Sequence, residues 1–286
     1  MSEETKTKKR SSLATRVMTA VPLVVGLVAA LAVGGWVLAA VIFVCAALAV
    51  YEELNALKMG GHRPVWWTSF AALVIALPLM MNFTYVGMIP LMLVMCLCVL
   101  FQVMIRKEPD LIDILVSQLP IFTIVVPAMC IIGVLDTQPR ILQMMFLVFV
   151  FTTSLGADIF AYFVGSTVGG PKLCPQISPN KTISGAIGGL LGSMIVTVLA
   201  GLIFRWINPA FFAGYPFIWA DAVVGLIGGA AAQMGDLTAS LIKRHCKIKD
   251  FGHIFPGHGG MLDRLDSIVF TAIVIYCYRV ILLGLV

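Results

Sequence analysis

Long uninterrupted apolar runs constrain the fold of this sequence more than any other feature. The chain has 286 residues, of which 60% are hydrophobic and only 12% are charged. A soluble domain is nearer half apolar and about a quarter charged. Runs of about 18 or more apolar residues are typical of membrane-spanning helices, because lipid offers no hydrogen-bond partner to a bare backbone. The sequence therefore predicts an all-α, polytopic membrane helix bundle.

We expect about nine transmembrane helices in a single membrane domain. The apolar runs cover residues 17–33, 36–50, 66–82, 85–105, 116–135, 141–163, 183–204, 222–242 and 267–285. Gly34-Gly35 separates the first two runs, which are short and could form a tight helical hairpin. We divide the chain into a basic tail at 1–16, nearly featureless helices at 17–153 and a catalytic membrane region at 154–286.

The distribution of basic residues predicts the orientation. With the N-terminus in the cytoplasm, 16 of the 19 Lys and Arg residues fall on the cytoplasmic side, and only Arg140, Arg205 and Arg279 fall on the other. Cytoplasmic loops of membrane proteins carry such an excess of Lys and Arg. We therefore expect the tail and the main polar loops to face the cytoplasm.

Two acids lie inside predicted spans, Asp158 and Asp236. Each is roughly 10 Å from the cytoplasmic end of its helix, at 1.5 Å per residue. Acids in a membrane are costly and usually face a polar cavity, although each could simply join two helices by a hydrogen bond. Ser240 lies one turn after Asp236 on the same helix face. The basic pair Lys243-Arg244 follows one turn later, and such a pair can also snorkel to the membrane surface.

The loop before the last run, KIKDFGHIFPGHGGMLDRLDS, is rich in glycine and charge. Glycines let backbone N–H groups approach an anion closely. Asp263 and Asp266 open the last helix, where an acid can cap the helix or hold a hard cation. Mg²⁺ prefers such oxygen ligands, together with substrate phosphates and water. The loop is therefore a candidate site for a cation and a polyanion.

A second polar loop, at 165–185, offers Lys172, Ser178, Lys181 and Thr182. It is not a P-loop, because no Lys directly follows the second glycine of the Gly-x4-Gly spacing. It suits phosphate binding, although a solvated loop attracted to anionic lipid would have the same composition.

Other chemistries find less support in the sequence. The seven cysteines are scattered, without a CxxC pair, and are expected to be small apolar fillers. A zinc site at Cys246, His253 and His258 would match no recurring spacing. No nucleophile elbow is present. Basic groups beside carboxylates suit phosphoryl or nucleotidyl transfer, in which catalysis is mainly positioning and charge neutralisation.

The stretch from Ser240 to Ser267 resembles the signature of the phosphatidate cytidylyltransferase family, also called CDP-diacylglycerol synthases. The matching positions include Lys243-Arg244, Lys249-Asp250, Pro256-Gly257-His258-Gly259-Gly260 and Asp263-Arg264-x-Asp266. Gly235-Asp236-Leu237, Ser178-Pro179-x-Lys181-Thr182 and Asp158-x-x-Ala161-Tyr162-Phe163 also fit. The resemblance covers 154–286. The sequence departs from the family pattern at Ile159-Phe160, where Thr-Gly is usual, and at Ser184 and Ala239, where Glu is usual.

The resemblance implies transfer of CMP from CTP to phosphatidate, giving CDP-diacylglycerol and pyrophosphate, with Mg²⁺ as cofactor. It implies cation ligands at Asp236, Asp263 and Asp266. It implies charge neutralisation by Lys181, Lys243, Arg244, Lys249 and Arg264. It implies phosphate binding by Ser178, Thr182, Ser240, Gly257, His258, Gly259 and Gly260, with Asp158 and Asp250 as secondary candidates.

The expected partners are CTP, phosphatidate and the lipid bilayer of a bacterial inner membrane; we expect no nucleic acid, and a homodimer is compatible with the sequence. One alternative is another CTP-using lipid enzyme, such as a polyprenol kinase or an ether-lipid cytidylyltransferase. A transporter is the alternative from another class, and it would place acids at the midplane of two related halves.

Overall fold

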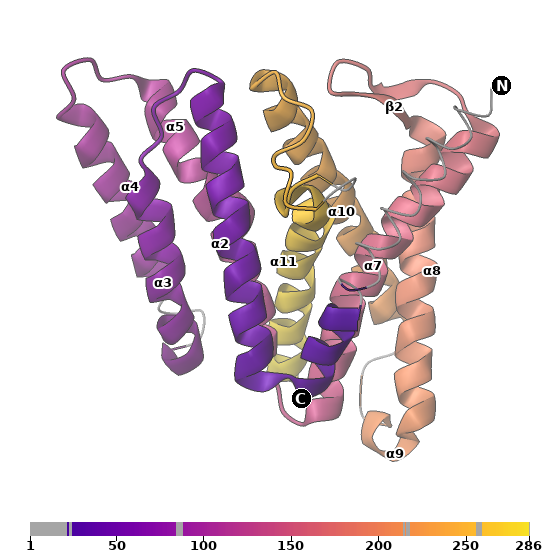
Figure 1. Ribbon diagram of the computed structural model, residues 1–286. Coiled ribbons are helices and arrows are strands. Elements are labelled where there is room, and N and C mark those ends of the chain that lie inside the picture. The colour runs from indigo at the N-terminus through magenta and orange to yellow at the C-terminus, as the bar shows by residue number, and fades with distance from the viewer. Residues whose placement is uncertain are drawn as a thin grey trace.

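The computed structural model describes residues 22, 25–83, 88–213, 215, 218–255 and 259–285. These residues form a bundle of helices, which confirms the all-α membrane fold (Figure 1). Six helical segments are long and apolar enough to cross a membrane. They are α2 (Gly35–Met59), α5 to α6 (Leu111–Val134), α7 (Arg140–Val168), α8 (Ile183–Ile207), α10 (Ile218–His245) and α11 (Leu262–Leu285).

Every predicted apolar run overlaps a helix, but the count of nine spans stays a prediction. Two further helices, α3 (Trp66–Phe83) and α4 (Met88–Met104), are apolar and shorter, and α9 (Pro209–Phe212) is a single turn. The first run is helical at 25–33, and its beginning lies outside the described residues, as does the tail at 1–16. The chain turns between this helix and α2 at Gly34 and Gly35, whose φ angles are 68° and 50°. Glycine adopts positive φ without steric cost, so the two helices separate at the Gly34-Gly35 pair, as predicted.

The fifth predicted run is a continuous but irregular helical path. It begins earlier than expected, as α5 (Leu111–Pro120), passes through the π-helix η2 (Ile121–Val125) and continues as α6 (Val126–Val134). Pro120 and Pro127 lie on either side of η2. Proline lacks the N–H that a regular helix would use, so the hydrogen-bond ladder changes register between them.

Asp113 ties together the ends of several helices near the start of α5. Its side chain is almost fully buried and accepts a hydrogen bond from Arg106 at 2.8 Å and another from Arg63 Nε at 3.1 Å. Arg63 precedes α3, and Arg106 follows α4. The polar stretch 106–113 therefore holds three helix ends in fixed positions.

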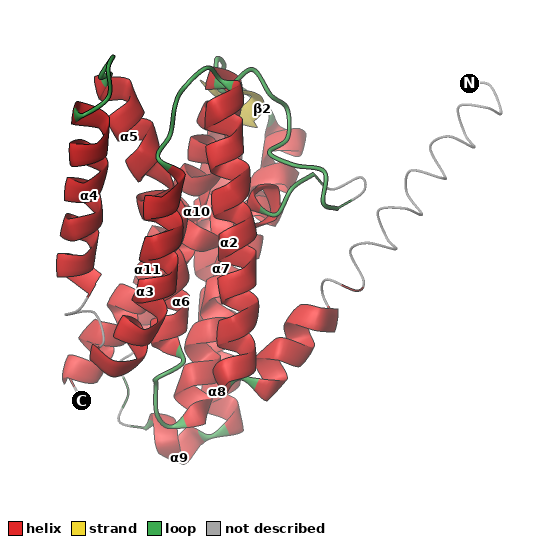
Figure 2. Cartoon of the chain, turned by 60° about the vertical axis from the view of Figure 1, so that its left-hand side comes forward, coloured by secondary structure: helices red, strands yellow, loops and turns green. Residues whose placement is uncertain are grey.

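The loop between α7 and α8 contains a small antiparallel hairpin that the sequence did not predict. Strand β1 (Lys172–Cys174) pairs with β2 (Ser178–Thr182), with a shift in register between the pairs Lys172–Thr182 and Cys174–Ser178. The strands are confined to one end of an otherwise helical bundle (Figure 2). We call this end the site end, because the start of α8, the end of α10 and the start of α11 also lie there (Figure 1).

Glycines let α7, α8, α10 and α11 pack backbone against backbone. A Cβ on Gly189 of α8 would lie 2.8 Å from both the Ala157 carbonyl of α7 and the Gln233 amide of α10. A Cβ on Gly235 of α10 would lie 2.1 Å from the Asp266 carbonyl of α11. Small residues at helix contacts are the usual means of close approach in membranes. These contacts bring polar residues from different helices to the same depth.

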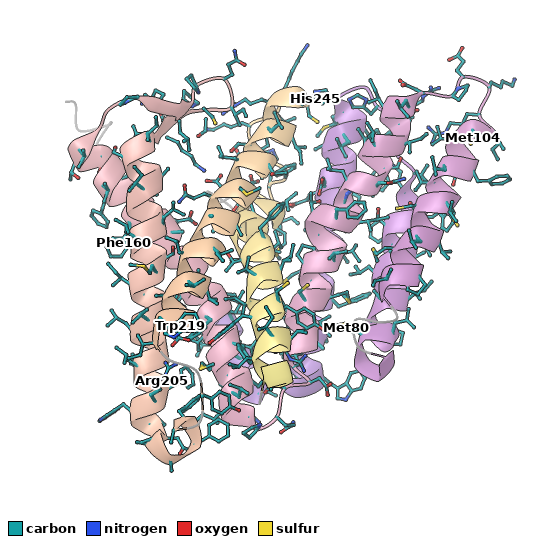
Figure 3. All side chains as sticks on the ribbon, turned by 180° about the vertical axis from the view of Figure 1, so that it is seen from behind. Met80, Met104, Phe160, Arg205, Trp219 and His245 are labelled. Atoms are coloured by element: carbon teal, nitrogen blue, oxygen red, sulfur yellow. The ribbon has the colours of Figure 1, made fainter. Side chains whose placement is uncertain are left out.

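A closed polar cluster lies at the opposite end of the bundle, where Arg205 and Trp219 are labelled far from His245 (Figure 3). Asp221 of α10 is 0% exposed. It accepts a hydrogen bond from Arg205 of α8 at 2.5 Å and one from Tyr278 of α11 at 3.1 Å. This cluster joins three helices through one buried acid.

Candidate active site

The hairpin delivers Lys181 to α10. Thr182, the next residue, caps α8 by accepting a hydrogen bond from the Gly185 N–H at 3.1 Å, which fixes the end of β2. Lys181 then forms an ion pair with Asp236, and the two side chains are 28% and 27% exposed. The other oxygen of Asp236 is 3.5 Å from the Ser240 hydroxyl. Lys181, Asp236 and Ser240 are therefore brought together, whereas the Thr182 hydroxyl serves the helix cap.

Lys243 and Asp263 form a second ion pair, between α10 and α11. The Lys243 ammonium is 2.7 Å from Asp263 Oδ1. Asp263 Oδ2 accepts hydrogen bonds from the Phe251 N–H at 2.8 Å and the Gly260 N–H at 3.0 Å. Both oxygens of this buried acid are thus engaged by the loop and by Lys243. Asp263 organises the loop between the two helices.

The basic pair at the end of α10 divides between two neighbours. Lys243 turns towards α11, whereas Arg244 Nε donates to the Ile177 carbonyl of the hairpin at 3.3 Å. The single face predicted for Asp236, Ser240 and the basic pair therefore splits at its outer end. Lys243 and Arg244 link the two polar loops that the sequence singled out.

Three acids from three helices interact with one another near Lys181. Asp266 of α11 interacts electrostatically with Asp236 of α10 and with Asp158 of α7. Asp158 also interacts with Lys181 and is within hydrogen-bonding reach of the Ser267 side chain. The close contact of Gly235 with the Asp266 backbone explains this meeting, because it places the neighbouring Asp236 next to α11.

These acids fit an ion that is held by few protein oxygens. Within the described part of the chain, no three His, Cys, Asp or Glu side chains converge tightly enough to enclose a metal ion. Mg²⁺ usually keeps several waters and uses one or two carboxylates plus substrate phosphates. Asp236 and Asp266 are both half-buried, and Asp236 would have to share its carboxylate with Lys181. Asp263 already uses both oxygens for Lys243 and the loop.

The remaining predicted site residues make few contacts with this centre in the described part of the chain. Lys249 and Arg264 are exposed, and Ser178 is half-buried at the start of β2. Gly259 has a φ of 81°, and its carbonyl accepts from the Phe255 N–H at 3.0 Å. The Gly260 N–H is committed to Asp263. Gly257 and His258 lie outside the described residues.

Glu52 of α2 is a residue of the site region that the sequence analysis missed. Its two oxygens accept hydrogen bonds from the Met261 N–H at 3.0 Å and the Leu262 N–H at 2.9 Å, where α11 begins. The first half of the chain is therefore not featureless. The available signal was the acid pair Glu52-Glu53 directly after the run at 36–50, because acids within a membrane helix usually have a role. The predicted run ends at residue 50, whereas α2 continues to Met59.

Cys246, part of the zinc alternative, is buried beside Gly60. Burial raises the pKa of the Cys246 thiol, and the charge of Glu53 adds to the effect. A thiol that stays protonated is a poor metal ligand. Cys246 therefore acts as packing, as its apolar setting predicts.

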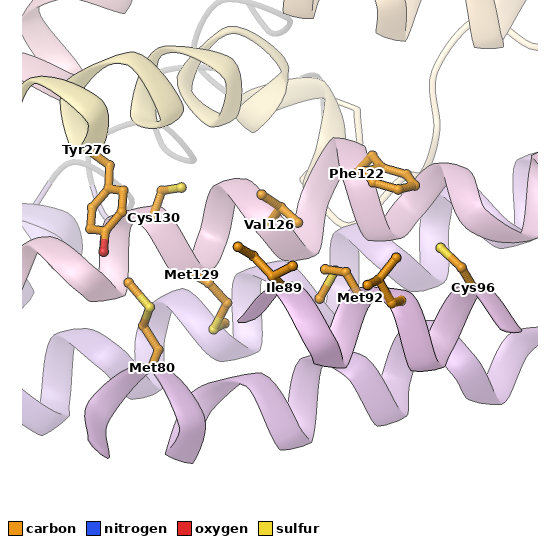
Figure 4. A pocket seen from close by; sticks show the side chains of 10 residues that line it. Met80, Ile89, Met92, Cys96, Phe122, Val126, Met129, Cys130 and Tyr276 are labelled. Carbon is orange, nitrogen blue, oxygen red and sulfur yellow. The ribbon is translucent and has the colours of Figure 1, made fainter. Parts of the chain in front are cut away.

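An apolar cavity of about 370 Å³ lies between α3, α4, η2, α6 and α11. Met80, Met92, Met129 and Tyr276 are among its lining residues (Figure 4). None of the predicted site residues lines it, so it is separate from the charged centre.

Comparison with known proteins agrees with the family resemblance found in the sequence. A model of the cytidylyltransferase family matches residues 14–282. The phosphatidate cytidylyltransferase of Brucella abortus biovar 1 (strain 9-941) is 42% identical over 135 residues, which is 47% of this chain and 47% of that protein. The protein of the same name from Synechocystis sp. (strain ATCC 27184 / PCC 6803 / Kazusa) is 43% identical over 129 residues, 44% of this chain and 40% of that one. That from Rickettsia prowazekii (strain Madrid E) is 43% identical over 126 residues, 44% of this chain and 54% of that one.

The chain thus spans about half the length of the curated relatives that it matches. The family model, in contrast, covers nearly all of it, up to the last turn of α11. This protein belongs to the cytidylyltransferase family.

Proposed function

We propose that this protein transfers CMP from CTP to phosphatidate, giving CDP-diacylglycerol and pyrophosphate in phospholipid biosynthesis. The observation that carries the proposal is the meeting of Lys181, Asp236 and Asp266, from β2, α10 and α11, at one end of a membrane bundle. The relatives that share up to 43% identity with this chain over the matched segments carry the corresponding name. A site at the end of the bundle suits the two substrates, because CTP stays in water while the acyl chains stay in lipid.

The reaction needs no nucleophile from the protein. An ionised oxygen of the phosphatidate phosphate attacks the α-phosphorus of CTP in line. The bond from that phosphorus to the oxygen bridging to the β-phosphate breaks, and pyrophosphate leaves with the electron pair. Lys181, Lys243, Arg244, Lys249 and Arg264 would neutralise the phosphates, with Ser178 and Ser240 as hydrogen-bond donors. Such a reaction depends on positioning and on stabilising negative charge.

Magnesium is the proposed cofactor, and it would supply charge neutralisation at the triphosphate. We assign Asp236 and Asp266 as its ligands, since both are half-buried and they interact electrostatically between α10 and α11. Asp263, the third acid expected from the sequence, would act first by holding Lys243 and the loop. Asp158 would help to keep the centre negative before the cation arrives.

We further propose that the site end faces the cytoplasm in a cell membrane, the inner membrane of a bacterium. The excess of Lys and Arg in the segments assigned to that side supports this orientation. Arg205 at the other end pairs with the buried Asp221, so part of the small opposing charge is neutralised.

The test is CTP-dependent labelling of phosphatidate in proteoliposomes, with and without Mg²⁺. Label from the α-phosphate of CTP should appear in lipid, and pyrophosphate should be released in equal amount. Label from the γ-phosphate alone would instead indicate a lipid kinase. Solute flux into the liposomes without CTP consumption would indicate a transporter.

A further inference from the structure

The carboxylate of Glu52 fills the amino end of α11. This side chain is 3% exposed and reaches from α2 to two successive N–H groups, those of Met261 and Leu262. The first N–H groups of a helix have no partner within the helix, and they carry its positive dipole end. An anion is therefore favoured at this place, and Glu52 supplies it from within the protein. Substrate phosphates must bind elsewhere in the site.

Two glycines of the loop enclose the same carboxylate. A Cβ on Gly252 would lie 2.3 Å from Glu52 Oε1, and a Cβ on Gly260 would lie 2.4 Å from Oε2. No real Cβ approaches an oxygen so closely, so a side chain at either position would displace the Glu52 carboxylate. Glu52 thus contacts the loop at Gly252 and Gly260, and also where the loop joins α11.

The contacts of Glu52 lead directly to the charged centre. Asp263 lies one residue after Leu262, and it accepts from Gly260 and from Phe251, which borders Gly252. Asp263 in turn holds Lys243. We propose that Glu52 is a positioning residue for the reaction: it fixes the loop so that Asp263 and Lys243, and Asp266 one turn later, stand in the geometry for transfer. This inference rests on the proposed function.

A merely stabilising role would also make Glu52 sensitive to mutation, so the test needs a matched control. Glu53 is the adjacent residue on α2 and is equally buried, but it accepts a hydrogen bond from the Thr123 hydroxyl of η2 at 2.8 Å. Glu52→Gln and Glu53→Gln are the same substitution at adjacent buried positions, and both preserve shape. Only the first presents an amide N–H to the backbone N–H groups of the loop.

The experiment combines kinetics with amide hydrogen exchange on the full chain in detergent or nanodiscs. In E52Q, amides within 251–262 should exchange about tenfold faster or more, since a hydrogen bond to a charged group is lost. Exchange in α7 and α8 should stay at the wild-type rate. The turnover number should fall by about tenfold to a hundredfold, with a much smaller change in KM for CTP, because misplacement affects the transition state most. E53Q should leave exchange in 251–262 unchanged.

A double-mutant cycle isolates the contact itself. Gly252→Ala should reproduce the faster loop exchange of E52Q, because its methyl group displaces the carboxylate. In a Glu52→Ala background the carboxylate is gone. Gly252→Ala should then raise the exchange rate of the loop amides by less than about twofold. An equal effect of Gly252→Ala in both backgrounds would overturn the assignment.

Two further outcomes would also overturn it. Wild-type loop exchange and turnover in E52Q would mean that the carboxylate positions nothing. Faster exchange throughout all helices of E52Q would mean that Glu52 serves general stability only. If wild-type protein labels no lipid from CTP, the proposed reaction fails, but the exchange measurements still report whether Glu52 holds the loop.

Discussion

Helix α10 carries an acid near each end, and the two acids have opposite surroundings. Asp221 is 0% exposed, and both its oxygens are occupied by the fixed partners Arg205 and Tyr278. Asp236 is 27% exposed, pairs with the similarly exposed Lys181 and has other acids nearby. Like charges gathered at an open place are unfavourable for folding alone, and such arrangements are characteristic of functional sites.

The comparison separates two uses of charge on one helix. The Asp221 cluster is saturated and closed, so it serves to join α8, α10 and α11. The Asp236 cluster holds excess negative charge. A bound cation would neutralise it and would also attract the phosphates of the substrates. The predictions below test this division.

The largest expected effect is the loss of turnover in Asp236→Asn. The substitution preserves shape but removes the charge that faces both Lys181 and the proposed cation. Turnover should fall by at least about a hundredfold, as for removal of a group that stabilises transition-state charge. Labelling of phosphatidate measures turnover, and thermal unfolding in detergent should remain near the wild-type midpoint. Near-normal labelling would remove Asp236 from the mechanism.

Asp221→Asn should lower stability and leave turnover unchanged, which is the reverse of Asp236→Asn. It leaves Arg205 without its buried partner charge, so the free energy of unfolding should fall by about 2–3 kcal/mol. Unfolding in detergent measures this loss, and turnover per folded molecule should stay close to wild type. If turnover fell while stability held, the two ends of α10 would not be functionally distinct.

Asp266 and Asp263 should differ in their response to magnesium. Asp266→Asn should raise the Mg²⁺ concentration for half-maximal rate by about tenfold or more, since it removes a proposed ligand. Asp263→Asn should abolish most turnover at every Mg²⁺ concentration while the protein still inserts and folds, because it releases Lys243 and the loop. Rate measured against Mg²⁺ concentration distinguishes them. If Asp263→Asn also raised the Mg²⁺ concentration for half-maximal rate, Asp263 would be a cation ligand.

Ser240→Ala should have the smallest effect. Its hydroxyl is 3.5 Å from Asp236, at the limit of a hydrogen bond, so turnover should fall by less than about threefold. Initial rates at saturating CTP measure it. A loss as large as that of Asp236→Asn would mean that the hydroxyl binds substrate directly.

The sequence predicts a similar depth for Asp158 and Asp236, and the two acids interact electrostatically in the structure. The spacing of Lys243 and Arg244 gave no indication that they turn towards different loops. Helical periodicity fixes a face to within a turn, but neighbouring helices decide where a long flexible side chain points.

The sequence by itself determined that this chain is a helical membrane protein of the cytidylyltransferase family. Apolar runs must form helices in lipid, because backbone groups there can bond only within the segment. Only the tertiary structure showed that Glu52, 209 positions before Met261, holds the start of α11. That contact depends on how closely α2 approaches the loop at Gly252 and Gly260, and no local pattern encodes a distance between segments so far apart.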